Sequence, residues 1–164
     1  MDSAALEQIL EADLRTRSAE VVIDGQSLLI GHGHIHSVEP ILEVRTGDGP
    51  GRAIGLIELG DDRWPVFCID GDLDILESQP AGRRACVLLK SDHGGVAFLC
   101  DEVRVVDDAA LRLVPVPGCM RTEHDLMESL AVLDGKVTCV LSADGLSRML
   151  TAGTSTSGVD QGER

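Results

Sequence analysis

The chain has 164 residues, of which 43% are hydrophobic, and a formal net charge of −14. This length fits one domain, or two small lobes that share a core, and excludes three independent domains. Two Phe, one Trp and no Tyr are too few rings for a base-stacking platform, and the negative charge repels phosphate backbones and anionic lipid heads. We therefore expect no nucleic-acid partner.

The N-terminal segment, residues 1–18, is expected to form a helix. Its large apolar residues recur at helical spacing: Leu6, Ile9, Leu10 and Leu14. The segment is charged throughout and lacks the apolar region of an export signal. No apolar run in the chain approaches the roughly 20 residues needed to cross a bilayer. We therefore expect a cytoplasmic protein that does not insert into a membrane.

From residue 20 onward, short apolar runs alternate with turns rich in Gly, Asp and Pro. The first two runs, 21–23 and 28–31, are joined across Asp24-Gly25, a favourable two-residue turn. Further strands are expected at 53–59, 64–69, 84–89, 95–100, 104–106, 111–116, 130–133 and 136–141. Short helices are expected at 72–77 and 143–150, and a disordered tail at 151–164. The pattern predicts an all-β fold, a sandwich or a pair of barrels.

Three histidines, His32, His34 and His36, alternate with other residues. On a strand they would share one face, where three imidazoles could bind zinc. The glycines at 31 and 33 favour instead a solvated hairpin tip, at which the side chains need not converge. We expect the hairpin tip and no metal cofactor, with a metal-binding protein as the alternative.

Acidic residues are frequent but do not form a recognisable catalytic or calcium-binding motif. Asp70-Gly71-Asp72-Leu73-Asp74 begins like a calcium loop, but Ile75 stands where Gly is required and Ala81 where Glu is required. The sequence contains neither a Gly-x-Ser-x-Gly elbow nor a phosphate-binding glycine loop with Lys. We therefore expect a protein that is not an enzyme and carries no cofactor.

Two side-chain types lead to separate expectations. Four of the five cysteines, Cys68, Cys86, Cys100 and Cys139, lie in apolar runs, which indicates buried, reduced thiols. The single Trp, Trp64, follows an arginine beside a predicted hairpin turn. Trp and Arg are frequent anchors of protein interfaces. Trp64 either serves as such an anchor or fills the core.

Four stretches, taken in order and spacing, resemble the CheW-like adaptor domains of bacterial chemosensory arrays. They are Ile41-Leu42-Glu43-Val44, Ile54 to Phe67, Gly95 to Val103, and Leu133 to Leu150. The resemblance covers about residues 19–150 and implies two five-stranded SH3-like barrels packed together. Leu59 stands where the family usually has Arg, and the hairpin turn is one residue longer. This hairpin is closer to the divergent accessory adaptors of type IV pilus (twitching-motility) systems.

The resemblance also implies a function. Adaptors of this family couple a chemoreceptor to a histidine kinase: the barrel flanks bind the regulatory domain of the CheA-like kinase, and the groove between the barrels receives the cytoplasmic tip of the receptor. Transferred to this chain, the resemblance implies partner contacts at Ile41, Glu43, Leu59, Arg63, Trp64, Val103 and Val105.

Overall fold

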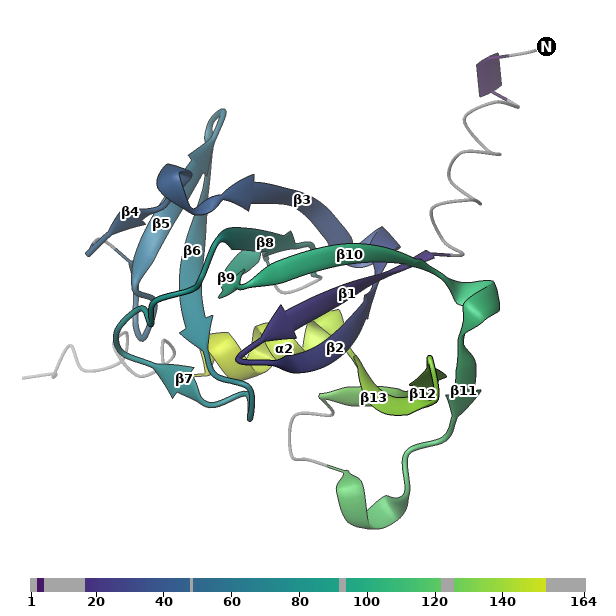
Figure 1. The fold of residues 1–164 in the computed structure, drawn as a ribbon. Helices are drawn as coiled ribbons and strands as arrows, with labels where there is room; N and C mark the ends of the chain where they lie inside the picture. Colours follow the sequence, from purple (N-terminus) through teal and green to yellow (C-terminus); the bar gives the residue numbers. More distant parts are fainter. Residues whose placement is uncertain (1–2, 5–16, 48, 92–93, 122–125, 153–164) are drawn as a thin grey trace, which may run out of the picture.

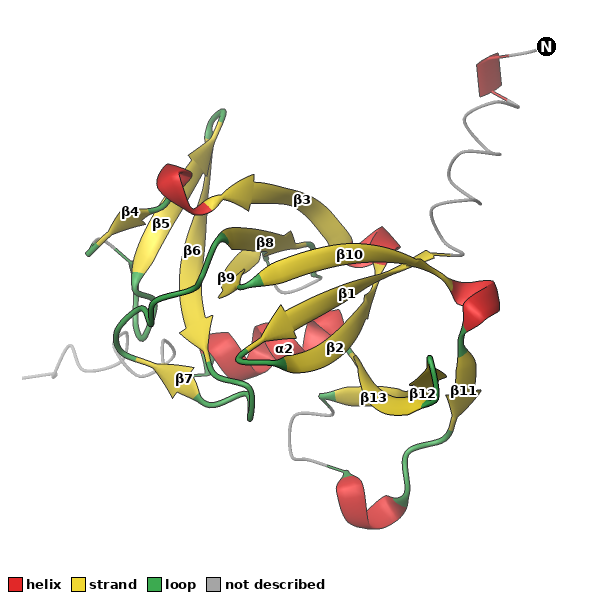
Figure 2. Ribbon diagram, in the orientation of Figure 1, coloured by secondary structure: helices red, strands yellow, loops and turns green. Residues whose placement is uncertain are grey.

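The computed structural model describes residues 3–4, 17–47, 49–91, 94–121 and 126–152 (Figure 1). Most of the expected N-terminal helix and the expected tail lie outside these residues, and Arg17 and Ser18 already belong to the first strand. The described chain folds into two β-sheets and the helix α2 (Ala143–Thr151), as Figure 2 shows. The expectation of a β-rich fold is therefore confirmed.

The first sheet has six strands, in the order β10-β1-β2-β13-β12-β11. They are β1 (Arg17–Ile23), β2 (Gln26–Gly31), β10 (Glu102–Asp107), β11 (Arg112–Val114), β12 (Met127–Leu133) and β13 (Lys136–Leu141). The predicted Asp24-Gly25 turn joins β1 and β2, and both residues have positive φ, 51° and 81°. Asp and Gly tolerate this left-handed backbone, which matches the twist of the hairpin strands.

The second sheet has seven strands, in the order β3-β8-β9-β6-β5-β4, with β7 pairing off this path to β6. They are β3 (Ile35–Pro40), β4 (Arg45–Thr46), β5 (Gly55–Leu59), β6 (Asp62–Ile69), β7 (Ile75–Leu76), β8 (Ala85–Leu89) and β9 (Val96–Cys100). Four short 3-10 turns complete the described elements: η1 (His32–His34), η2 (Ile41–Glu43), η3 (Asp108–Ala110) and η4 (Gly118–Met120). Two five-stranded barrels, as the resemblance implied, are not confirmed.

The second sheet is an insertion into the first. The chain leaves the first sheet after β2 and returns to it at β10, so strands of the first sheet come from residues 17–31 and 102–141. The two sheets and α2 enclose a shared core that includes Val21, Phe67, Phe98 and Leu146. The strands β6, β8 and β9 are buried on both faces, because their other face packs into a second core inside the second sheet. Strands buried on both faces read as unbroken apolar runs, as they do here.

Two sequence expectations are wrong in this part of the chain. Residues 72–77 do not form a helix: they contain the short strand β7, and the carboxylate of Asp70 accepts hydrogen bonds from the Asp72 and Asp74 amides, which stabilises a turn instead. The histidine stretch is not a hairpin tip, because β2 and β3 on either side of it belong to different sheets.

A buried arginine ties the two sheets together. The side chain of Arg83 has no exposed surface, and its guanidinium donates to the carboxylates of Asp24, in the β1–β2 turn, and Asp101, where the chain re-enters the first sheet, at 2.7 and 2.9 Å. It also donates to the backbone carbonyl of Ile69 at the end of β6, at 2.8 Å. The guanidinium holds the pKa of Asp24 below its usual value.

The cysteines give a first testable prediction. Cys68, Cys86 and Cys100 are fully buried, and burial raises the pKa of Cys86 and Cys100 to about 12, so that little reactive thiolate forms at neutral pH. Cys139 is half-buried and Cys119 is exposed. We expect one thiol, that of Cys119, to react rapidly with a thiol reagent in the native protein, as identified by peptide mass spectrometry. Rapid modification of Cys68, Cys86 or Cys100 without denaturant would contradict the burial.

Candidate functional site

Two of the predicted contact residues, Ile41 and Glu43, lie on η2, which directly follows the edge strand β3. The Ile41 amide donates to the Arg84 carbonyl at 3.2 Å, and its side chain packs against the second core. This anchors η2 on the sheet and leaves Glu43 exposed. Between them, Leu42, which is not among the contacts implied by the resemblance, is 91% exposed. It is the most exposed of the large hydrophobic residues in the described part of the chain.

The hairpin of β5 and β6 carries three further predicted residues: Leu59, Arg63 and Trp64. Leu59 pairs with Asp62 next to the turn and packs against the second core. Arg63 pairs with Glu58 across the hairpin, and its Nε lies 3.3 Å from the Glu58 carboxylate. A second guanidinium, from Arg45 on β4, lies 3.4 Å from the same carboxylate. The hairpin and the neighbouring strand β4 therefore present two arginines around one glutamate.

Trp64 is the most buried of the predicted contacts, with 8% of its surface exposed. Its indole belongs to the second core and lies so close to Gly95 that a Cβ atom there would collide with the ring. The ring of His36 also lies against the indole, with ring centroids 4.9 Å apart and the planes tilted by 31°. This placement matches the alternative in which Trp64 fills the core.

The last two predicted contacts, Val103 and Val105, lie on β10, the edge strand of the first sheet. Val103 packs against the shared core, whereas Val105, on the same face of the strand, is 59% exposed. On β3, the edge strand of the second sheet, Val38 pairs with the core residue Val87 and is 43% exposed. Both valines therefore lie on sheet faces that enclose the shared core, on strands whose outer edge pairs with no other described strand.

The structure thus divides the predicted residues into two groups. Ile41, Leu59 and Trp64 share the second core, whereas Val103 belongs to the shared core. Figure 1 shows β3 with η2 and the β5–β6 hairpin in the upper part of the molecule, and β10 crossing its centre. We call the exposed apolar residues of these elements, Val38, Leu42 and Val105, the edge patch. Val105 is among the contacts that the resemblance implies, whereas Val38 and Leu42 are not, because exposure of an apolar residue is not visible in a sequence.

The histidines are distributed over two elements. His32 and His34 lie on η1, and His36 lies on β3 against Trp64. Among the residues that the structure describes, no group of three His, Cys, Asp or Glu side chains is placed to hold a metal ion. The arrangement does not favour the metal-binding alternative.

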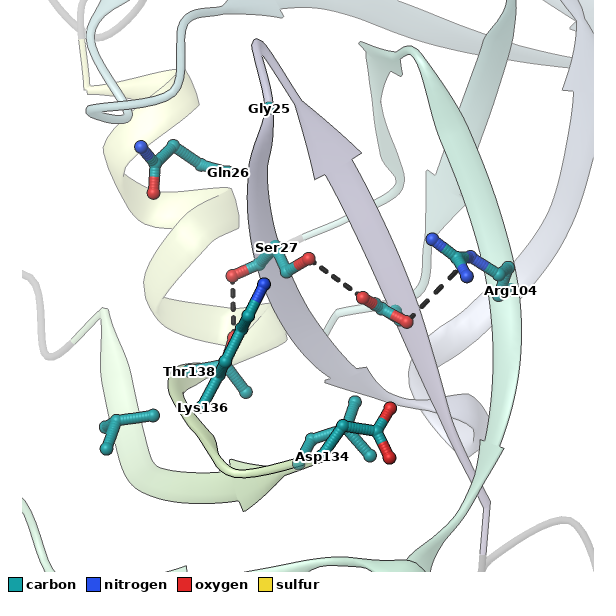
Figure 3. Close-up of a pocket in the computed structure, with 10 residues that line it drawn as sticks. Gly25, Gln26, Ser27, Arg104, Asp134, Lys136 and Thr138 are labelled. Atoms are coloured by element: carbon teal, nitrogen blue, oxygen red, sulfur yellow. Dashed lines mark hydrogen bonds and ion pairs between the residues drawn. The ribbon is translucent and has the colours of Figure 1, made fainter.

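A polar pocket of about 390 Å³ lies at the end of the first sheet that carries the Asp24-Gly25 and Asp134-Gly135 turns (Figure 3). Its residues Glu20, Ser27 and Arg104 alternate with residues of the shared core and so lie on the opposite face of the sheet. Within the pocket, the Ser27 hydroxyl donates to the Glu20 carboxylate at 2.8 Å, and the Thr138 hydroxyl donates to the Ser27 carbonyl at 2.6 Å. Arg104 approaches Glu20 from β10, at 4.0 Å. The described residues that line this pocket include no histidine or cysteine, so Ser27 has no imidazole beside it to act as a general base.

Comparison with known proteins gives a result at the level of the fold. No family model matches the chain, and no curated protein matches it by sequence. A helix long and apolar enough to cross a membrane does not occur in the described part of the chain. Among solved structures, the chain is similar to the scaffolding protein TtCheW from Thermoanaerobacter tengcongensis, with a TM-score of 0.62 and 15% sequence identity over 80% of this chain and 92% of that protein. The chain therefore has a CheW-like fold.

Proposed function

We propose that this protein is a non-catalytic adaptor of a bacterial chemosensory system, which couples a chemoreceptor to a histidine kinase. The observation that carries the proposal is the similarity in fold to a scaffolding protein, which extends over 92% of TtCheW and so includes nearly the whole domain. The resemblance of four sequence stretches to CheW-like adaptors supports the same function. The proposed adaptor acts in the cytoplasm and belongs to the accessory adaptors of type IV pilus systems.

In this proposal, the adaptor works by geometry. It holds receptor and kinase at a fixed distance, and a shift of the receptor changes the population of active kinase because the two binding events are coupled. The three residues of the edge patch, which are between 43% and 91% exposed, supply apolar area for such contacts. A chain with net charge −14 gains little from general attraction to other acidic proteins, so affinity has to come from apolar contacts and a few paired charges.

The receptor contact differs from that of the family at one position. Leu59 cannot donate hydrogen bonds to a receptor carboxylate, as the family's arginine can. In the proposal, part of this task falls to two other cations that flank Glu58: Arg63, on the same hairpin, and Arg45, on the neighbouring strand β4. Both already share one carboxylate, so each offers less to a partner than an unpaired arginine.

We expect the protein to bind the regulatory domain of its cognate histidine kinase in calorimetric titration, with modest dependence on salt. Val105→Asp and Leu42→Asp, which place charge on the edge patch, should weaken binding to a receptor-tip fragment about tenfold or more, because a few central residues dominate such interfaces. Both side chains are exposed, so the fold should tolerate the changes. A folded protein that binds neither the kinase domain nor the receptor fragment would refute the proposal.

Leu59→Arg restores the arginine of the family and should strengthen binding to the receptor fragment. The matched control is Leu113→Arg on β11, where the leucine is 64% exposed. This variant adds the same charge to an acidic protein but lies on the opposite edge strand of the first sheet from β10. Equal gains in affinity from both variants would show that the effect is general charge attraction and not a contact at the hairpin.

A further inference from the structure

A second candidate binding surface, separate from the edge patch, contains a groove. A groove of about 450 Å³ lies between the turn at residues 70–74, the strand β13 and the helix α2. In Figure 1 these elements border the lower half of the molecule, whereas β3 and η2 lie in the upper half. The volume is within the range of ordinary ligand pockets. Both sheets and the helix contribute to its walls, so its shape depends on the whole fold.

The wall formed by residues 70–74 is held rigidly. The Asp70 carboxylate accepts hydrogen bonds from two amides of the turn, and the Gly71 amide donates to the Asp24 carboxylate of the β1–β2 turn at 3.2 Å. Leu73 has a φ of 67°, which is unusual for a residue with a large side chain. This backbone points Leu73 to the shared core, against which it packs. Strained backbone of this kind is concentrated at sites that clamp ligands.

The groove combines an apolar lining with a negative rim. Its apolar lining includes Leu28, Leu126, Met127, Val137 and Met149. Val137 is 69% exposed, and methionine side chains adapt their shape to different partners. The rim carries the exposed carboxylates of Asp72 and Asp74, and the described residues that line the groove include no Lys or Arg. Apolar depth beneath a negative rim fits a ligand that has an apolar centre and positive flanks.

We propose that this groove binds a basic, amphipathic segment of a partner protein, with large apolar side chains in the groove and Lys or Arg side chains beside Asp72 and Asp74. The negative rim and the net charge of −14 repel anionic lipids and nucleic acids, which leaves a protein segment with positive flanks as the complementary occupant. The proposal goes beyond the adaptor function and does not depend on it, because the groove shares no residue with the edge patch.

The test uses the full chain labelled with 13C in the methionine methyl groups. The chain has four methionines, of which Met127 and Met149 line the groove and Met120, 40% exposed on η4, does not. The probe is the peptide acetyl-Lys-Lys-Leu-Leu-Lys-Lys-amide. We expect saturable shifts of the Met127 and Met149 methyl signals and no shift of Met120. A peptide with Glu in place of each Lys, and one with Ser in place of each Leu, should shift none of these methyl signals.

Two variants separate the charged from the apolar part of the contact. Asp72→Asn combined with Asp74→Asn should weaken peptide binding about fivefold, the effect of losing two exposed ion pairs. The turn should persist, since Asp70 is unchanged and the amides of the substituted residues still donate to it. Val137→Lys should abolish binding, whereas the matched Val105→Lys on the edge patch should not alter it. Absent shifts, equal shifts with the glutamate peptide, or equal binding by the asparagine variant would overturn the proposal.

Discussion

Replacement of Arg83 by Met is expected to lower the free energy of unfolding by about 3–5 kcal/mol. The guanidinium is fully buried and donates to three groups: the carboxylate of Asp24 in the first sheet's β1–β2 turn, that of Asp101 just before β10, and the Ile69 carbonyl of the second sheet. Methionine fills much of the same volume but donates no hydrogen bond to these oxygens. A buried polar group that loses its partner costs more free energy than the intact pair contributes to stability. Because Asp24 and Asp101 are partly exposed, water offsets some of this cost, so the lower end of the range is expected.

The measurement is urea unfolding at neutral pH, with Arg63→Met as the matched control. Arg63 also forms an ion pair, with Glu58, but its side chain is 71% exposed, so its loss should cost no more than about 1 kcal/mol. If the two variants were equally stable, the buried network would not hold the sheets together.

The same network predicts how stability depends on pH. Arg83 lowers the pKa of Asp24 in the folded state, so the folded protein favours the ionised carboxylate more than the unfolded chain does. The stabilisation from this carboxylate is present above the unfolded pKa, near 3.8, and is lost as the pH falls through the folded pKa. Stability of the Arg83→Met protein should therefore decline less steeply on acidification, as followed by unfolding at several pH values. An unchanged slope would mean that Arg83 does not act on Asp24.

Trp64→Ala is the second substitution with a large expected effect, a loss of about 3–5 kcal/mol of folding free energy. The indole is nearly buried, belongs to the second core and is in contact with Gly95 and His36, so truncation leaves a cavity that the closely packed sheet cannot close. Trp64→Phe should cost less, since it keeps a ring and removes an indole N–H that has no acceptor among the described residues.

Unfolding of the Trp64 variants is followed by far-UV circular dichroism, since Trp64 is the only tryptophan and its loss removes the fluorescence signal. Leu42→Ala is the control: this leucine is 91% exposed, so its truncation should change stability by less than about 0.5 kcal/mol. If Trp64→Ala were as stable as the parent protein but bound a partner less well, Trp64 would be an interface anchor after all.

The parts of the fold that local chemistry determines could be predicted from the sequence. Asp24-Gly25 formed the expected turn because Asp and Gly accept positive φ, and α2 appeared at the expected place, with Ser142 accepting a hydrogen bond from the Gly145 amide as its cap. The runs that became β6, β8 and β9 were recognisable because burial on both faces leaves no polar alternation.

The parts that depend on distant residues could not be predicted. The strand β3 has exposed His36, Val38 and Pro40, because it lies at the edge of its sheet, and this position is not visible in the sequence. The turn at Asp70 was mistaken for a helix because its carboxylate competes with the helix for backbone amides. The exposure of Val38 and Leu42 could not be predicted either, because it depends on how the two sheets pack and not on the neighbouring sequence.

The insertion of one sheet into the other has a consequence for the growing chain on the ribosome. Leu28 of β2 pairs with Cys139 of β13, so the first hairpin has to wait for the synthesis of the whole second sheet and most of the remaining strands. At about 5–20 residues per second this delay lasts on the order of 5–20 s. During that time Val21, Ile23 and Leu28 have no complete core to enter. The nascent hairpin is therefore the segment on which a chaperone, or a neighbouring nascent chain, has the longest opportunity to act.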